Sequence, residues 1–369
     1  MKSFAAGVTS PSTTGAALSV WHEGEEVVNL WAGTADARDG SLWAADTLQV
    51  IFSASKGLTA VVLMQMHERG ELNIDAPIRS VWPQFAAHGK GDISIGDVLA
   101  HQAGVSAPRE DLSLEEVLDS AALAERIAAQ VPLWTPGAAH AYHAITYGTI
   151  AQEIVRRVDG RELHEVFQQE IASPLEADVS LKLHPHHLRR VARIETTPNW
   201  DRARSSGSDE DDAWIGRALT MGGAFPRPLV AGDEGFNDPR VILAGVAGAG
   251  GVGTASGLAR IWSAVVRETR GVRLLNDASV ARLAAVRSEG PWHFNPGPPF
   301  HRWGAGVQLS SDVTPWFSPD SLGHDGAGGQ SGIADHKLGV ALGYVTNHMD
   351  TVDRVAPIIE AFGSLEPVS

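Results

Sequence analysis

The chain has no cysteine among its 369 residues. Disulfides, thiolate zinc sites and cysteine nucleophiles are therefore excluded. Long apolar runs are missing as well, since no stretch approaches the roughly 18 apolar residues of a membrane-spanning helix. The segment from Met1 to Pro11 has no apolar core of the kind found in signal peptides. We therefore expect a soluble cytoplasmic protein that does not bind membranes.

Positive charge is scarce. Lysine and arginine number 29 against 44 aspartate and glutamate residues, which gives a net charge of −15. The basic residues form no long stripe, so the sequence argues against nucleic acid and anionic membranes as partners. With 43% hydrophobic and 20% charged residues, the chain has the composition of a globular protein and enough length for two lobes around a large core.

Several common functional motifs are absent. No Gly-x-Ser-x-Gly sequence occurs, which argues against the nucleophile elbow of α/β-hydrolases. The glycine-rich segment 245–253 is not followed by Gly-Lys-Ser/Thr and has no acidic residue at the spacing of a ribose ligand. We interpret it as a tightly packed turn. The histidines between 184 and 187 and the acidic run 209–212 lack the spacing of metal ligands, and we expect no metal site.

What the chain does contain is the tetrapeptide Ser-Ala-Ser-Lys at residues 53–56. The run from Gly57 to Met66 that follows has almost no polar face, which predicts a helix buried on most sides. Positions i and i+3 lie on one face of a helix, so Lys56 can reach the hydroxyl of Ser53. A serine hydroxyl becomes a good nucleophile only when a base accepts its proton. This motif therefore suggests nucleophilic catalysis.

The remaining patterns outline a sheet with helices between its two ends. Residues 14–52 predict strands and turns. Helical spacing occurs at 113–130 and 145–158, and strands are expected at 303–310 and 338–347. Because extended segments lie at both ends of the chain, we expect the N- and C-terminal strands to share one sheet.

Two further segments complete a known pattern. Trp134 to Ala144 places Tyr142 after a Pro-Gly turn and before a helix, and Gly323 to Gly329 places polar side chains at the end of a strand. Together with Ser-x-x-Lys, this trio resembles the group of serine β-lactamases, penicillin-binding proteins and family VIII carboxylesterases. Further similarity covers most of the chain, at residues 93–104, 253–260 and 339–347.

The resemblance implies catalytic roles for the matching residues. Ser53 would be the acylated nucleophile, with Lys56 and Tyr142 as its proton-transfer partners. The backbone N–H groups of Ser53 and Ala327 would form the oxyanion hole. Lysine and tyrosine have reference pKa values near 10, so a base at neutral pH needs a pKa lowered by about three units. A contact between Lys56 and Tyr142 would supply this shift, and the proton would then belong to the pair rather than to either residue.

The sequence departs from the β-lactamase pattern at two positions. Ala144 replaces the asparagine whose side-chain amide binds the acylamino group of a penicillin. His324, in the sequence His324-Asp325-Gly326, replaces the lysine of Lys-Thr-Gly that helps to hold a carboxylate. Both variants look more like family VIII esterases. By the same resemblance, His324 and Gly326 would bind substrate.

An aromatic, proline-rich loop spans residues 291–300. It shortly precedes the strand expected to lead to His324, so we expect Trp292 and Phe300 to border the substrate pocket. Four prolines would hold the loop with little entropy left to lose on binding. The alternative is a lid that only packs on the surface.

The resemblance implies an α/β fold of the serine β-lactamase type, in which a mainly antiparallel sheet is flanked by helices and carries an inserted, mostly helical lobe. We expect residues 1–85 and 240–369 to form the α/β domain, and residues 86–239 the helical domain, with the active site between them.

The expected function is carboxylesterase activity on short- to medium-acyl esters through a Ser53 acyl-enzyme. It would need no metal or organic cofactor, and its partner would be a small-molecule ester. The same residues could serve an amidase, a β-lactamase, a D-aminopeptidase-type hydrolase or an acyltransferase. A non-catalytic binding module would be expected to lose Ser53 or Lys56. The sequence does not indicate an oligomeric state.

Overall fold

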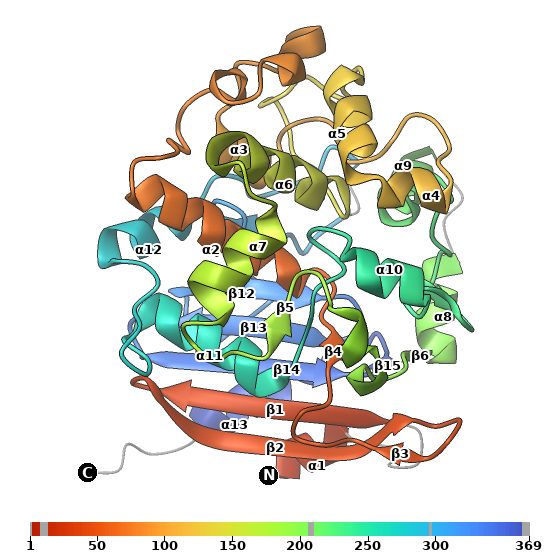
Figure 1. The fold of residues 1–369 in the computed structure, drawn as a ribbon, viewed down its shortest axis with the longest axis vertical. Coiled ribbons are helices and arrows are strands. Elements are labelled where there is room, and N and C mark those ends of the chain that lie inside the picture. The colour runs from red at the N-terminus through yellow and green to blue at the C-terminus, as the bar shows by residue number, and fades with distance from the viewer. Residues whose placement is uncertain (1, 8–13, 206–209, 295–296, 364–369) are drawn as a thin grey trace.

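The central sheet is built from both ends of the chain. The structure, a computed structural model, describes residues 2–7, 14–205, 210–294 and 297–363. Eight antiparallel strands follow the order β10-β11-β12-β13-β14-β1-β2-β3 (Figure 1). Their bounds are β1 (Gly15–His22), β2 (Glu25–Asp36), β3 (Ser41–Leu42), β10 (Arg302–Trp303), β11 (Gln308–Leu309), β12 (Ser321–Gly326), β13 (Gln330–Asp335) and β14 (Val340–Thr346). Because β1 pairs with β14, the expectation of a sheet shared by both ends is confirmed.

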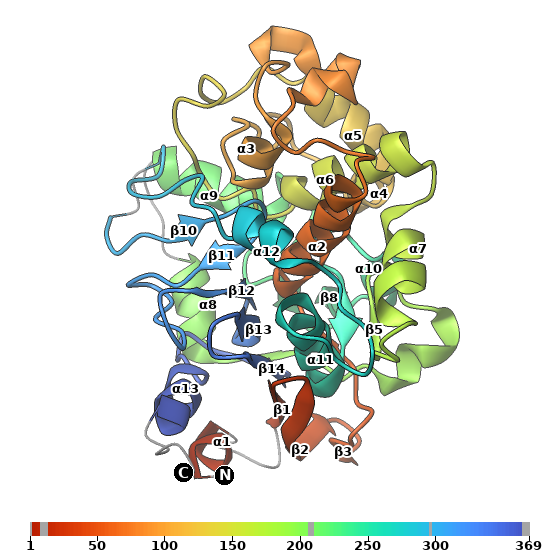
Figure 2. The same ribbon diagram turned by 90° about the vertical axis from the view of Figure 1, so that its left-hand side faces the viewer.

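Helices cover both faces of this sheet (Figure 2). On one face, α11 (Ala255–Val266) packs across β1, β13 and β14. The approach is close because β14 has a glycine there: a Cβ on Gly343 would lie 2.3 Å from the Ala255 carbonyl oxygen. On the other face, α1 (Lys2–Gly7) and α13 (Ala356–Gly363) pack together over a second apolar cluster.

The buried helix predicted after Ser53 is α2 (Ala54–Glu68). Nearly all of its side chains are buried, and it packs against β12 and β13 of the sheet and against α6, α7 and α12. Above the sheet in Figure 1 lie most of the remaining helices. These are α3 (Ile95–Leu99), α4 (Leu114–Leu118), α5 (Ser120–Ala129), α6 (Thr146–Asp159), α7 (Leu163–Phe167), α8 (Pro198–Ser205), α9 (Glu210–Thr220), α10 (Pro239–Ala244) and α12 (Asp277–Leu283). The helices expected at 113–130 and 145–158 are thereby confirmed.

Short elements connect these helices. Four brief 3₁₀ or π turns are η1 (Ile78–Ser80), η2 (Pro83–Gly89), η3 (Gln168–Ala172) and η4 (Pro185–Arg190). The remaining strands are β4 (Gln49–Val50), β5 (Val179–Ser180), β6 (Glu195–Thr196), β7 (Val230–Ala231), β8 (Glu234–Gly235), β9 (Val252–Gly253) and β15 (His348–Met349). Of these, β4 pairs with β9 and fixes the chain immediately before α2.

The prediction of a single strand at residues 303–310 is wrong. The segment forms a tight hairpin, in which β10 pairs antiparallel with β11. Gly306 has a φ of +88°, which favours glycine, and a Cβ on Gly304 would lie 2.1 Å from a neighbouring backbone oxygen. The two glycines therefore close a turn inside a segment whose apolar residues predicted a continuous strand.

The glycine-rich segment 245–253 is a packing turn, as its sequence indicated. It lies against α6, where a Cβ on Gly148 would be only 1.7 Å from the Ala247 carbonyl oxygen. One continuous apolar core joins α2, α6 and α11, so the division into domains at residues 85 and 239 stays a prediction. Over the ranges that the structure describes, no helix is both long and apolar enough to cross a membrane.

Candidate active site

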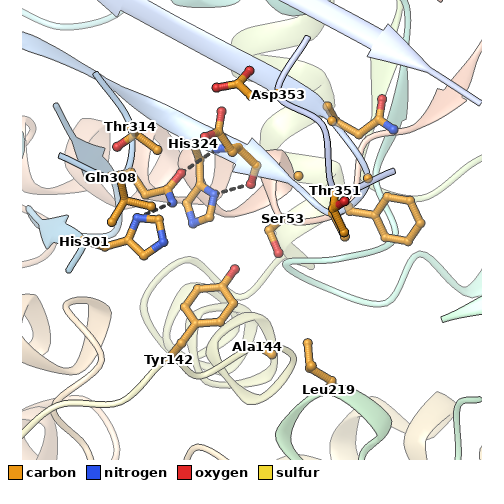
Figure 3. A pocket seen from close by; sticks show the side chains of 18 of the residues that line it. Ser53, Tyr142, Ala144, Leu219, His301, Gln308, Thr314, His324, Thr351 and Asp353 are labelled. Atoms are coloured by element: carbon orange, nitrogen blue, oxygen red, sulfur yellow. Dashed lines mark hydrogen bonds between the residues drawn. The ribbon is translucent and has the colours of Figure 1, made fainter. Parts of the chain in front are cut away.

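Ser53 lies in the turn between β4 and α2, at the N-terminal end of the buried helix (Figure 3). The preceding residue, Phe52, has a φ of +45°, which side-chain-bearing residues rarely adopt. The Phe52 ring packs edge to face on Phe236, with 5.0 Å between the ring centroids. Within the turn, the Ala54 N–H donates to the Ile51 carbonyl at 3.1 Å. This conformation leaves Ser53 half-buried at the wall of a cavity.

Lys56 is fully buried one helical turn after Ser53. Its Nζ lies 2.9 Å from the Ser53 Oγ, 2.7 Å from the Ala144 carbonyl oxygen and 2.8 Å from the Gly248 carbonyl oxygen. Burial lowers the pKa of Lys56 well below its ordinary value of 10.5. The structure therefore favours the neutral amine.

A neutral amine matches the three neighbours of Lys56. It has two N–H donors and one lone pair, whereas an ammonium has three donors and no acceptor. The two carbonyl oxygens can only accept hydrogen bonds, so they take the two N–H groups. The lone pair is then left for the Ser53 hydroxyl, which is the one neighbour able to donate a proton. This arrangement is suited to removing that proton.

Tyr142 lies on the opposite wall, and its hydroxyl points toward Ser53 (Figure 3). The Lys56 Nζ is 5.0 Å from the centroid of the Tyr142 ring. The ring stacks on Trp303 at 5.4 Å with an interplanar angle of 19°, and His101 contacts it edge on at 4.9 Å. The expected proximity of Lys56 and Tyr142 is thus present in the structure.

Two buried histidines, which the sequence reasoning missed, hold the segment that carries Tyr142. The His101 Nδ1 accepts from the His143 backbone N–H at 3.2 Å. The His143 side chain donates from Nδ1 to the Ala141 carbonyl at 2.7 Å and accepts at Nε2 from the Val105 N–H at 3.2 Å. Burial, with nearby His143 and Lys56, lowers the pKa of His101 far below its usual range, and burial lowers that of His143 to about 4. Both rings therefore stay neutral and act as fixed hydrogen-bonding spacers.

His324 lines the cavity from β12. Its Nδ1 donates to the Asp325 carbonyl oxygen at 2.6 Å, so its Nε2 presents a lone pair. Burial and the nearby Lys56 lower the pKa of His324 well below its usual range. The Nε2 atom is buried and has no hydrogen-bond partner among the described residues. His324 is therefore neutral, and its side chain lines the cavity while its acceptor atom is buried.

Asp325, to which the sequence analysis gave no role, is a second unexpected feature. Its backbone N–H donates to the Gln308 Oε1 at 2.6 Å, and Gln308 in turn reaches the His301 Nδ1 at 3.4 Å (Figure 3). Its carboxyl accepts from the Ser331 hydroxyl at 2.6 Å. Burial raises the pKa of Asp325 to about 7, although the Ser331 hydrogen bond opposes the shift. No sequence motif distinguishes this aspartate from an exposed one.

The cavity beside Ser53 has a volume of about 540 Å³. Its wall includes seven of the residues singled out from the sequence, namely Ser53, Tyr142, Ala144, Trp292, His324, Gly326 and Ala327. Lys56 lies behind Ser53. Other lining side chains are mostly apolar or aromatic, including Phe52, Trp200, Leu219, Phe236, Phe294 and Trp303. Within the described ranges, no three metal-ligating side chains are grouped together.

Phe300 is the exception among the expected site residues. It is half-buried and does not line the cavity. The first half of its loop is tied down, because the His293 N–H donates to the His140 carbonyl at 2.8 Å. Phe294 and His301 occupy the cavity wall instead. Residues 295 and 296 of the loop lie outside the described part of the chain.

Comparison with known proteins identifies the family. A family model described as beta-lactamase matches residues 2–361. The esterase/beta-lactamase LipL of Mycobacterium tuberculosis is 31% identical over 353 residues, which are 91% of this chain and 77% of that protein. A crystal structure of a family VIII carboxylesterase matches with a TM-score of 0.86 and 31% identity, covering 98% of this chain and 95% of the other. EstA from Arthrobacter nitroguajacolicus matches with a TM-score of 0.85 and 26% identity, covering 98% and 96%.

The chain therefore belongs to the β-lactamase family. It is a serine hydrolase with the serine β-lactamase-like fold, as the sequence predicted. Among its neighbours, carboxylesterases and a relative named for both esterase and β-lactamase activity support ester hydrolysis in the broad sense.

Proposed function

We propose that this protein is a carboxylesterase that hydrolyses short- to medium-acyl esters through an acyl-enzyme on Ser53. The observation that carries the proposal is the position of the Lys56 Nζ, 2.9 Å from the Ser53 Oγ with two backbone carbonyls as its other neighbours. The apolar cavity beside Ser53 suits the hydrocarbon part of such an ester.

In the acylation step, the neutral Lys56 accepts the hydroxyl proton while the Ser53 Oγ attacks the ester carbonyl. The carbonyl π electrons move to its oxygen, which the backbone N–H groups of Ser53 and Ala327 stabilise. Each such donor lowers the barrier by about 3 kcal/mol in comparable enzymes. Ser53 is also at the N-terminal end of α2, where the helix dipole favours negative charge.

Tyr142 connects Lys56 to the leaving group. The tetrahedral intermediate collapses by breaking the bond to the alcohol oxygen, which takes a proton from the Tyr142 hydroxyl as Lys56 returns its proton to Tyr142. A water molecule then attacks the acyl-enzyme, with the same two residues removing its proton and returning one to the Ser53 Oγ. No metal or organic cofactor takes part in these steps.

Esters are favoured over β-lactams for two reasons. Ala144 has no side-chain amide to bind an acylamino group. His324 is neutral and presents an acceptor, so it cannot pair with the carboxylate of a penicillin. β-Lactam hydrolysis is the second candidate, because the relative LipL is named an esterase/beta-lactamase. Amidase, D-aminopeptidase-type and acyltransferase reactions would use the same residues.

A parallel substrate panel tests the proposal. We expect kcat/KM for p-nitrophenyl butyrate to exceed that for benzylpenicillin by about 100-fold or more. The polar groups of benzylpenicillin would find no partners at Ala144 and His324, and unpaired polar groups in a site cost much affinity. A D-alanyl p-nitroanilide covers the amidase alternative. The Ser53→Ala variant gives the background for each substrate. Benzylpenicillin turnover that rivals the butyrate ester would contradict the proposal, whereas slow turnover of the reactive nitrocefin fits it.

A further inference from the structure

The active-site cavity continues around the end of β12 to the opposite face of the sheet. His324 and Asp325 are consecutive on that strand, so their side chains point to opposite faces, yet both line the cavity. The wall beyond Asp325 comes from segment 350–353 and from α13, which covers the face opposite α11. The cavity therefore joins the Ser53 side of the sheet to a second chamber.

This second chamber carries uncompensated negative charge. The Asp325 carboxyl is buried and receives one hydrogen bond, from Ser331, and no cationic group of the described residues is within ion-pair distance of it. The charge of Asp353, which also lines the cavity, adds to the electrostatic penalty on the ionised form of Asp325. Arg354 compensates Asp350, which also lines the cavity, at 3.7 Å and donates to the His348 carbonyl at 2.9 Å, but it forms no ion pair with Asp325.

The other polar side chain that lines the cavity from β12, His324, carries no positive charge. The buried His324 Nε2 offers a lone pair and has no partner among the described residues. Around these acceptors the walls are apolar, with Trp316, Val355 and Ile359 in the second chamber. A carboxylate ligand would be repelled by the Asp325 and Asp353 carboxylates here, although Thr351 and Gln330 offer hydrogen-bond donors. A cationic ligand would meet carboxylates and an indole face, both of which attract it.

We propose that this acidic chamber, formed by Asp325 and Asp353 with Trp316 as its aromatic wall, binds an alkylammonium group of the ester substrate. The proposal deepens and rests on the proposed esterase function. A positive group in the chamber would compensate the two carboxylates nearest the cavity while its alkyl part packs on the apolar walls. The selected substrates are cationic esters, and anionic ones are rejected.

The preference depends on pH because the chamber binds a cation best when Asp325 is ionised. The charged and titratable groups around it are Asp350, Asp353 and Arg354 before α13, Tyr344 on β14, and His301 through Gln308. Burial raises the pKa of Tyr344 to about 12 and lowers that of His301 to about 4, so both stay neutral between pH 6 and 8. In that window Asp325 ionises as the pH rises, and the preference for a cation increases.

Matched ester pairs test the proposal. Butyrylcholine and 3,3-dimethylbutyl butyrate differ in a positive charge on the alcohol side. The p-nitrophenyl esters of 4-(trimethylammonio)butyrate and 5,5-dimethylhexanoate differ in the same way on the acyl side. We expect the cationic member of at least one pair to have the higher kcat/KM, by about tenfold. We also expect that ratio to grow from pH 6 to pH 8.

Variants connect the ratio to the chamber. Asp325→Asn and, as a second variant, Asp353→Asn should each reduce the cationic-to-neutral ratio about tenfold. Asp312→Asn is the charge-matched control, because Asp312 is exposed and near the cavity but does not line it. Ser331→Ala removes the hydrogen bond that holds the Asp325 pKa down, so it should move the pH midpoint of the ratio upward.

A binding measurement separates this proposal from the esterase function. In Ser53→Ala protein, calorimetry should detect n-propyltrimethylammonium, and the added Asp325→Asn substitution should weaken its binding. If the neutral esters are hydrolysed and neither pair shows a preference for its cationic member, the proposed cation binding is wrong and the proposed esterase function still holds. Binding of the cation without hydrolysis of any ester would instead overturn the esterase. The proposed cation binding is also contradicted if Asp325→Asn and Asp353→Asn proteins melt like wild type and keep the same cationic-to-neutral ratio of kcat/KM.

Discussion

Lys56 is held in the core by two backbone carbonyls and a hydroxyl rather than by a carboxylate. A counter-ion would favour the ammonium form, whereas burial without one favours the amine. The absence of a counter-ion therefore favours the form of Lys56 that can accept a proton. Its acceptors come from segments far apart in the sequence, at Ala144 and Gly248, so no local motif could have predicted them.

Lys56 and Tyr142 should behave as one catalytic unit, because the proton passes through both. We expect Lys56→Ala and Tyr142→Phe each to lower kcat by about 10³-fold or more, and the double variant to be little worse than either. Steady-state kinetics on p-nitrophenyl butyrate gives kcat for the wild type, the two single variants and the double variant. Thermal melts check that each variant folds. Losses that multiply in the double variant would show that the two residues act independently.

At this scale the sequence predicted that Ser53, Lys56 and Tyr142 lie together but not what surrounds them. Ser53 and Lys56 could be recognised because a helix brings positions i and i+3 together, which is a local geometric rule. His101 and Asp325 were missed because their roles follow from burial and from partners on other strands. Phe300 was misplaced, since a single sequence does not indicate which side of an irregular loop faces a cavity.

At the scale of elements, the glycine-rich segment 245–253 is a structural support of Lys56, the base in the proposed mechanism. It contacts α6 through Gly148 and supplies the Gly248 carbonyl that accepts from the Lys56 Nζ. The sequence correctly suggested a packing turn, but its link to catalysis is a tertiary contact. The hairpin of β10 and β11 was missed for a related reason, because its turn depends on two glycines and not on the apolar pattern.

Gly148→Ala tests this support. The added methyl would lie 1.7 Å from the Ala247 carbonyl oxygen, so the segment must move and take the Gly248 carbonyl away from Lys56. We expect a loss of about 1–3 kcal/mol in the free energy of unfolding, together with a lower kcat. Denaturant unfolding and ester kinetics measure the two effects.

Gly216→Ala is the matched control, since it is also a helical glycine. The nearest atom to the added Cβ belongs to the flexible end of Arg227, 3.7 Å away. It should stabilise the protein by about 0.5–1 kcal/mol through better helix propensity and leave kcat unchanged. A Gly148→Ala protein that matches this control in stability and kcat would show that the segment does not position Lys56.

At the scale of the whole molecule, the two ends of the chain build one sheet and the catalytic residues gather beside it. The sheet itself was predictable, because the strands expected near the two ends of the chain had few other strands to pair with. The cavity that bends around the end of β12 was not predictable, since it depends on how α13 and segment 350–353 pack against the edge of the sheet. The net charge of −15 gave no indication that Asp325 and Asp353 lie together there.

The central claim is that Ser53 carries the acyl group. Brief treatment with a fluorophosphonate, followed by peptide mass spectrometry, tests it most directly. We predict one covalent adduct on the peptide that contains Ser53, its suppression by excess p-nitrophenyl butyrate, and its absence from Ser53→Ala protein that melts like wild type. An adduct on a different serine, or esterase turnover that persists above a few per cent in Ser53→Ala, would contradict the account.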